Sequence, residues 1–197
     1  AKGKDRILAA LSGVIVTVLN HPEFGQTLSR ADGAFDIAVN GGGNLIVSYE
    51  KVGYLPVQRQ VKAPWQDFAF PPEVVMIPLH TQLTTVTMNS ASPQVAQGSL
   101  VTDSSGSRRA TVLFPAGTAA SMVLPNGSVQ PLSSLQLRAT EYTIGPNGPK
   151  AMPAPLPPDS GYTYAVEYSA DEALTAAARS VQFNQPVIHY NENFLGF

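Results

Sequence analysis

The stretch SRADGAFDIAVNGGG, from Ser29 to Gly43, decides how this chain folds. Within it, Ala34–Val39 alternates large apolar residues with small or polar ones, so that every second side chain is apolar. An alternation with a period of two predicts a strand with one buried face, and it places Asp36 on the opposite, exposed face. The stretch therefore predicts a half-buried strand rather than a catalytic loop.

Two turn signals flank this predicted strand. Asp32-Gly33 supplies the positive φ angles of a tight hairpin turn, and Asn40 with Gly41–Gly43 supplies the next turn. The carboxylates of Asp32 and Asp36 then have separate roles, one in a turn and one on a strand face. The glycine run is not followed by the Lys and Ser/Thr of a phosphate-binding loop, nor by a helix. We therefore predict structural turns and no active site here.

Short β-rich runs recur along the whole chain, separated by turn residues that include 16 Gly and 17 Pro. The predicted strands are Val14–Leu19, Gln26–Ser29, Ala34–Val39, Leu45–Glu50, Val57–Val61, Val74–Leu79, Leu83–Met88, Ala110–Phe114, Ser121–Leu124, Leu135–Ala139, Tyr162–Tyr168 and Val181–Phe183. This spacing is typical of β-sandwiches and barrels. The sequence therefore predicts an all-β fold.

One short helix is predicted over about Ala170–Ala178, where strong helix formers follow a capping signal. Ser169 stands at the N-cap position and Glu172 three residues later, the spacing of a capping box. The alanine-rich composition carries no reactive group, so this helix is expected to connect two strands.

Composition narrows the classes of function. The chain has 197 residues, with 12 Lys and Arg against 14 Asp and Glu, and this balance leaves no basic excess for a nucleic-acid partner. Zero cysteines exclude disulfides and thiolate metal sites. His21, His80 and His189 have no second ligand at metal spacing. We therefore predict no catalytic residue, no metal ligand and no cofactor.

The N-terminal apolar run Ile7–Leu19 could be mistaken for a secretion signal. Its β-branched residues alternate with a period of two, and no small-residue cleavage site follows, so a strand is the better interpretation. No apolar run reaches the roughly 18 residues of a membrane-spanning helix. The sequence therefore predicts no membrane-spanning segment.

A domain boundary is predicted in Lys62–Glu73, which holds three prolines and the aromatic residues Trp65, Phe68 and Phe70. The boundary gives a first domain of residues 1–72 and a second of 73–197. Two interpretations of the aromatic residues are open: they pack in the seam between domains, or they form an exposed platform for sugar rings or another ligand. An exposed Trp65 would favour the platform.

A proline-rich stretch, Gly145–Gly161, cannot form a strand or helix through most of its length. We predict an extended loop inside the second domain. A docking motif for a groove that recognises proline-rich peptides is the alternative, although its PAPLPP core lacks flanking arginines.

The run Leu11–Val61 resembles the carboxypeptidase regulatory-like domain, a transthyretin-like Greek-key sandwich. The residues that carry the resemblance are Leu11-Ser12-Gly13-Val14, Thr27-Leu28-Ser29, Asp32-Gly33-x-Phe35, Gly42-Gly43-x-Leu45 and Gly53-Tyr54. The resemblance implies a non-catalytic folding, packing or adhesion module. Relatives often carry Asp-x-Asp-Gly where this chain has Arg30-Ala31-Asp32-Gly33, so the first Asp, on which a cation site would be built, is missing here.

Beyond that run, the order of segments resembles the part that precedes the repeats in bacterial RHS/YD-repeat proteins, which are related to toxin-complex cocoon proteins, polymorphic toxins and teneurins. The segments are Pro64–Leu79, Leu113–Thr118, Leu137–Ala173 and Phe183–Phe197. The resemblance implies a bacterial, secreted or cell-surface protein in which this segment packs on or caps the repeat shell.

Both ends depart from that pattern. Ile7-Leu8 and Ala10 stand where such modules place Asp-Gly and Pro, so we expect an unprotected sheet edge or a strand supplied by preceding chain. The chain stops at Phe197 where relatives continue, so a fragment with a truncated second domain is expected.

The resulting expectation is a transthyretin-like Greek-key β-sandwich followed by a second β-sandwich with one short helix. The expected function is non-enzymatic assembly, with other domains of the same longer chain as partners. The alternative is a carbohydrate- or protein-binding adhesion module, with a cell-surface protein or glycan as partner.

Overall fold

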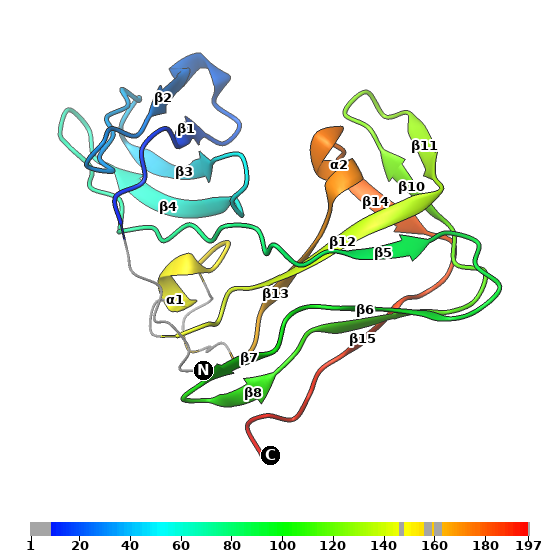
Figure 1. Cartoon of the computed structure of the whole chain (residues 1–197). Helices are drawn as coiled ribbons and strands as arrows, with labels where there is room; N and C mark the ends of the chain where they lie inside the picture. The colour runs from blue at the N-terminus through cyan, green and yellow to red at the C-terminus, as the bar shows by residue number, and fades with distance from the viewer. Residues whose placement is uncertain (1–8, 146–147, 156–158, 160–162, 197) are drawn as a thin grey trace. The chain divides into compact units, whose positions relative to one another are not determined.

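The computed structural model describes residues 9–145, 148–155, 159 and 163–196, and its fold is all-β, as predicted (Figure 1). The chain forms two compact units. The described residues up to Leu79, with those of Gly145–Ala165, form the N-terminal unit. The described residues of His80–Ile144 and Val166–Phe197 form the C-terminal unit.

The N-terminal unit is built on a four-stranded antiparallel sheet in the order β2-β1-β3-β4. Its elements are β1 Ile15–Val18, the 3-10 helix η1 Pro22–Phe24, β2 Gln26–Leu28, β3 Gly43–Glu50, β4 Val57–Ala63 and α1 Gly148–Ala151. Val16 on β1 lies opposite Tyr49 on β3, and both are buried on the apolar face of the sheet. Because β-branched side chains alternate along these strands, one face becomes the core.

Two extended segments cover this face without forming a ladder. The predicted strands Ala34–Val39 and Val74–Leu79 are wrong as strands, since the first has no paired residue and the second has only the bridge between Pro78 and Tyr54. The alternation predicted for Ala34–Val39 is present, however, with Phe35 half-buried against the core and Asp36 exposed. An alternating pattern fixes which side chains face the core, but a ladder also needs a neighbouring strand, and β1 already pairs with β2 and β3.

The described residues of the proline-rich stretch lie in the N-terminal unit, not in the unit that follows. Arg59 on β4 is buried, and its guanidinium donates hydrogen bonds to the Lys150 and Met152 carbonyls at 2.6 and 2.9 Å. The Gln58 N–H donates to the Pro153 carbonyl at 2.8 Å. A segment outside any ladder leaves its carbonyls free, and a buried guanidinium needs such acceptors.

These contacts divide the chain differently from the predicted domains of residues 1–72 and 73–197. The N-terminal unit runs to Leu79 and takes in Gly145–Ala165, which the sequence analysis assigned to the second domain. Tyr162 at the predicted start of a strand, Ile7-Leu8 and Phe197 lie outside the described residues.

The C-terminal unit contains the remaining strands and the helix α2. Its elements are β5 Thr84–Thr87, β6 Gln94–Gln97, β7 Val101–Asp103, β8 Gly106–Arg108, β9 Thr111–Phe114, β10 Ala120–Val123, β11 Val129–Leu132, β12 Ser134–Glu141, β13 Val166–Ala170, α2 Asp171–Thr175, β14 Ser180–Phe183 and β15 Ile188–Tyr190. The sheets are β13-β12-β5, β15-β9-β6, β11-β10-β14 and the hairpin β7-β8. β6, β7, β8, β11 and β15 were not predicted.

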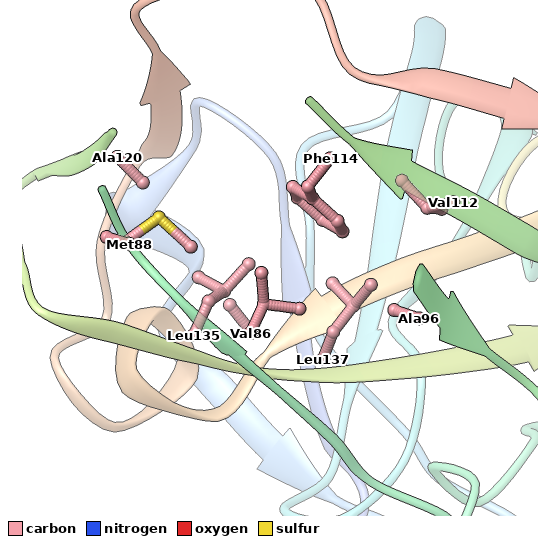
Figure 2. Close-up of a cluster of buried hydrophobic side chains, with 9 residues drawn as sticks. Val86, Met88, Ala96, Val112, Phe114, Ala120, Leu135 and Leu137 are labelled. Atoms are coloured by element: carbon pink, nitrogen blue, oxygen red, sulfur yellow. The ribbon is translucent and has the colours of Figure 1, made fainter. Parts of the chain in front are cut away.

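The core of the C-terminal unit lies between β13-β12-β5 and β15-β9-β6. Figure 2 shows Leu135 and Leu137 on one side of this core and Phe114 on the other. Phe114 is 1% exposed, and its ring meets the Phe183 ring edge-on at 5.9 Å between centroids. The interdigitating side chains of two layers make this unit a β-sandwich.

The helix α2 lies where the sequence predicts one, but it is shorter and has no capping box. Ala170 is the N-cap residue because β13 continues through Ser169, which is buried. The Glu172 carboxylate instead accepts the Gln136 N–H of β12 at 3.0 and 3.1 Å. In the part of the chain that the structure describes, no helix has the length and apolar character needed to cross a bilayer.

Candidate functional site

Asp32 and Asp36 have the separate roles that the sequence predicts. Gly33 has a φ of +81°, and the Arg30 N–H donates to the Ala34 carbonyl at 2.8 Å, so the chain reverses at Asp32-Gly33. The Asp32 carboxylate accepts the Ala34 N–H at 2.9 Å, which ties it into the turn. Asp36 is exposed and pairs with the Arg30 guanidinium. The two carboxylates are thus held by different local structures.

The glycine run is a turn whose geometry requires glycine. Gly42 has a φ of +95° and donates its N–H to the Ala63 carbonyl at 2.8 Å. A Cβ atom on Gly41 would lie 2.0 Å from the Pro64 carbonyl oxygen. Because no side chain tolerates such an approach, Gly41 is fixed by its contact with the backbone after β4.

The aromatic segment, Trp65–Phe70, is exposed. Trp65, Phe68 and Phe70 are 70%, 82% and 89% exposed, so none of them is buried in the unit that carries it. Gln66 has a φ of +55° and turns the chain away from β4, and the Asp67 carboxylate accepts the Phe68 N–H at 2.7 Å. This local structure displays the three rings to solvent, which is the arrangement of a contact surface.

The three histidines have separate environments. His21 pairs with Glu23 at 2.8 Å and stacks on Phe24, whereas the His80 ring accepts the Gln82 N–H at 3.0 Å. His189 meets the Tyr168 ring edge-on at 5.3 Å between centroids. Across the described residues, no group of three His, Cys, Asp or Glu side chains is placed to hold a metal ion.

A buried charge cluster in the C-terminal unit was missed by the sequence analysis. Arg108 is 2% exposed, and it donates two hydrogen bonds to the Asp103 carboxylate at 2.8 and 2.9 Å. Its Nε donates to Glu141 Oε1 at 2.6 Å, and Thr143 Oγ1 donates to the same oxygen at 2.7 Å. The guanidinium lies 4.7 Å from the centre of the Phe194 ring. The hydrogen bonds that Arg108 donates to Asp103 and Glu141 raise its pKa.

This cluster joins three parts of the unit: the hairpin β7-β8, the end of β12 and the segment after β15. The hairpin and the segment after β15 lie close together, since a Cβ atom on Gly106 would lie 2.9 Å from the Phe194 carbonyl oxygen. An arginine that is 2% exposed and donates to two carboxylates is typical of a structural site.

Tyr49 is a buried titratable group in the N-terminal unit. It is 5% exposed, and among the described residues its hydroxyl has no hydrogen-bond partner. Burial raises the pKa of Tyr49 to about 12, and the nearby Arg59 charge opposes that rise.

We expect the N-terminal unit to lose stability as the pH rises from about 10 to about 12. Tyrosine ionises near pH 10 in an unfolded chain, so the unfolded state binds fewer protons than the folded state in this window and becomes favoured. Tyr49→Phe should remove this part of the pH dependence. It should also raise the free energy of unfolding near neutral pH by up to about 1 kcal/mol, because an unsatisfied hydroxyl is removed.

Urea denaturation at about pH 8 and about pH 11, followed by circular dichroism, measures this effect. Val52→Ser, at a position that is 98% exposed in the same unit, is the control and should leave the pH dependence unchanged. A Tyr49→Phe variant that is less stable than wild type near neutral pH would show that the hydroxyl has a partner.

The four-stranded antiparallel sheet and its buried apolar face define the N-terminal unit as a transthyretin-like β-sandwich module. Residues 4–76 match the family model of the teneurin TTR-like domain. Over 66 residues, the chain is 36% identical to mouse Teneurin-4, 41% to zebrafish Teneurin-3 and 38% to human Teneurin-1. No solved structure gives a significant match.

The extent of these matches is limited. They cover 34% of this chain and 2% of each relative, so the chain spans a small part of the proteins it resembles. The predicted transthyretin-like domain is confirmed for residues 4–76, with teneurins as its relatives. The C-terminal unit lies outside the match.

Proposed function

We propose that this chain is a non-enzymatic assembly segment of a large secreted or cell-surface protein. In this function the chain packs on, caps or plugs adjoining domains of the same polypeptide, and we propose an RHS/YD-repeat shell as the adjoining structure. The match to a domain that makes up 2% of its relatives supports a modular role. The relatives named above are animal proteins, so a bacterial origin rests on the order of segments alone.

The observation that carries this proposal is the aromatic segment. Soluble domains rarely leave neighbouring large aromatic side chains in water without a use, and exposed aromatic residues are enriched at protein contacts. Trp65, Phe68 and Phe70 together offer more apolar surface than solitary exposed residues do. A contact with an adjoining domain would remove this surface from water.

A second function, a carbohydrate- or protein-binding adhesion module, is favoured by the exposure of Trp65. An indole face stacks on the apolar face of a sugar ring, and the polar side chains of Gln66 and Asp67 stand next to it in the chain. Titration of the isolated chain with oligosaccharides separates the two functions. A sugar that stacks on Trp65 would quench its fluorescence, whereas a chain that binds only a partner domain would show no change in Trp65 fluorescence.

The triple variant Trp65→Ser, Phe68→Ser and Phe70→Ser tests the assembly function. In the isolated chain we expect the free energy of unfolding to change by less than about 1 kcal/mol, since exposed side chains add little to stability. In the longer protein we expect the affinity of this segment for its neighbours to fall at least about tenfold.

Val52→Ser is the matched control, because Val52 is 98% exposed in the same unit and lies outside the aromatic segment. Pull-down of the adjoining domains with this chain supplied separately gives the readout. Equal retention by the triple variant, the control and wild type would contradict the proposal.

A further inference from the structure

A cavity of about 1370 Å³ lies in the N-terminal unit. Valine and leucine side chains of β1 and β3 line one part of it, and the extended segments Ala34–Val39 and Phe68–Met76 line another. The cavity is open to solvent, since Phe68 and Phe70 in its lining are 82% and 89% exposed. An open site with a largely apolar lining suits an occupant that carries apolar groups.

The extended segments are suited to pair with a strand. Among the described residues, no hydrogen bond joins the backbone of Phe35–Val39 to a neighbour, although every second side chain of this segment is half-buried. An extended backbone with free N–H and C=O groups is a template for an added strand. This feature favours a polypeptide over a lipid, because a lipid leaves those backbone groups unused.

Tyr49 provides a polar anchor in the cavity. Its ring reaches from β3 to the covering layer, where it meets the Phe35 ring edge-on at 5.7 Å between centroids. Tyr49 lines the cavity, and its buried hydroxyl has no partner among the described residues. A peptide carbonyl of an inserted strand would accept the proton of this hydroxyl.

The described residues that line the cavity carry charges of one sign. They include Asp32, Asp36, Asp67 and Glu73, and no Lys, Arg or His is among them. Asp36 pairs with Arg30 and Glu73 with Lys150, but the carboxylates of Asp32 and Asp67 accept only backbone N–H groups in the described structure. The lining therefore attracts a cationic occupant and repels a fatty acid.

We propose that this cavity binds an extended polypeptide segment that alternates apolar side chains and carries Lys or Arg near its ends. The apolar side chains fill the cavity, the peptide groups pair with Phe35–Val39 and Tyr49, and the basic ends lie near Asp32 and Asp67. The proposal deepens the assembly function by giving the chemistry of one partner. Phe68 and Phe70 also line the cavity, so the two proposals share part of one surface. Their tests can still fail separately, because the charge and Tyr49 variants below leave Trp65, Phe68 and Phe70 unchanged.

The test uses the whole chain and a fluorescent peptide that alternates valine with threonine and has lysine at both ends. We expect saturable binding in fluorescence anisotropy, and binding at least about tenfold weaker when glutamate replaces both lysines, because like charges repel. Absence of saturable binding, or equal binding of the two peptides, overturns the proposal.

Three variants locate the binding. Asp32→Asn with Asp67→Asn should weaken the lysine peptide about three- to tenfold, and asparagine keeps the turn at Gly33. Tyr49→Phe should weaken binding by a similar factor without unfolding the chain. Glu50→Gln, an exposed carboxylate of the same unit outside the cavity, is the matched control. Equal binding by all variants overturns the proposal.

Discussion

Arg108→Met is expected to lower the free energy of unfolding of the C-terminal unit by about 3–5 kcal/mol, the cost of breaking a buried ion pair by removing one partner. Methionine fills much of the space of the arginine stem, so packing changes little. Glu141 is 6% exposed, and without the guanidinium its charge and that of Asp103 would be left close together in a poorly solvated site. The Phe194 ring would also lose its cation contact.

Urea denaturation followed by circular dichroism measures this loss, and the adjacent Arg109 offers a matched control. Arg109 is half-buried, donates to the Gln97 side chain at 3.2 Å, and has no partner for its buried Nε among the described residues. Arg109→Met therefore breaks no buried ion pair and should cost less than about 1 kcal/mol. Adding Asp103→Asn and Glu141→Gln to Arg108→Met should restore part of the stability, because the uncompensated charges disappear. Equal effects of Arg108→Met and Arg109→Met would contradict a central role for this cluster.

Arg59→Met is expected to destabilise the N-terminal unit by about 2–4 kcal/mol, since buried carbonyls lose a charged donor. The guanidinium donates to the carbonyls of Gln58, Lys150 and Met152. Arg59→Lys should recover only part of the loss, because an ammonium group cannot match the planar fork of donors.

Hydrogen exchange gives the second readout for Arg59. The Gln58 N–H donates to the Pro153 carbonyl, so its protection should fall in Arg59→Met if Arg59 holds that segment in place. Lys62→Met, at an exposed position on the same strand, is the control and should leave the exchange of Gln58 unchanged. Unchanged protection in Arg59→Met would show that the segment is held by other contacts.

Local patterns were enough to predict much of the fold. The period-two runs predicted most long strands. Asp32-Gly33 and the run Asn40–Gly43 predicted turns, in which Gly33 and Gly42 have φ of +81° and +95°. Alternation also predicted which side of Ala34–Val39 faces the core. It could not supply a pairing neighbour, which depends on where other strands lie.

The buried arginines Arg59 and Arg108 show which contacts could not be predicted from the sequence. Val57, Arg59 and Val61 share one face of a strand, so a cation on an apolar face was visible in the pattern. Glu141 likewise continues the face that carries Leu135 and Leu137. Their partners, such as Met152 and Asp103, come from distant or short segments without periodicity, so only the tertiary structure could identify them. The exposure of Trp65 depended on tertiary structure in the same way.

The proposal that this chain works by packing against a larger assembly is tested most directly by hydroxyl-radical footprinting of the aromatic segment. Labelling of Trp65–Phe70 is compared between the isolated chain and the longer protein, with the exposed Val52 as internal reference. The account predicts strong labelling of the aromatic segment in the isolated chain and protection in the longer protein. Equal labelling in both would contradict it.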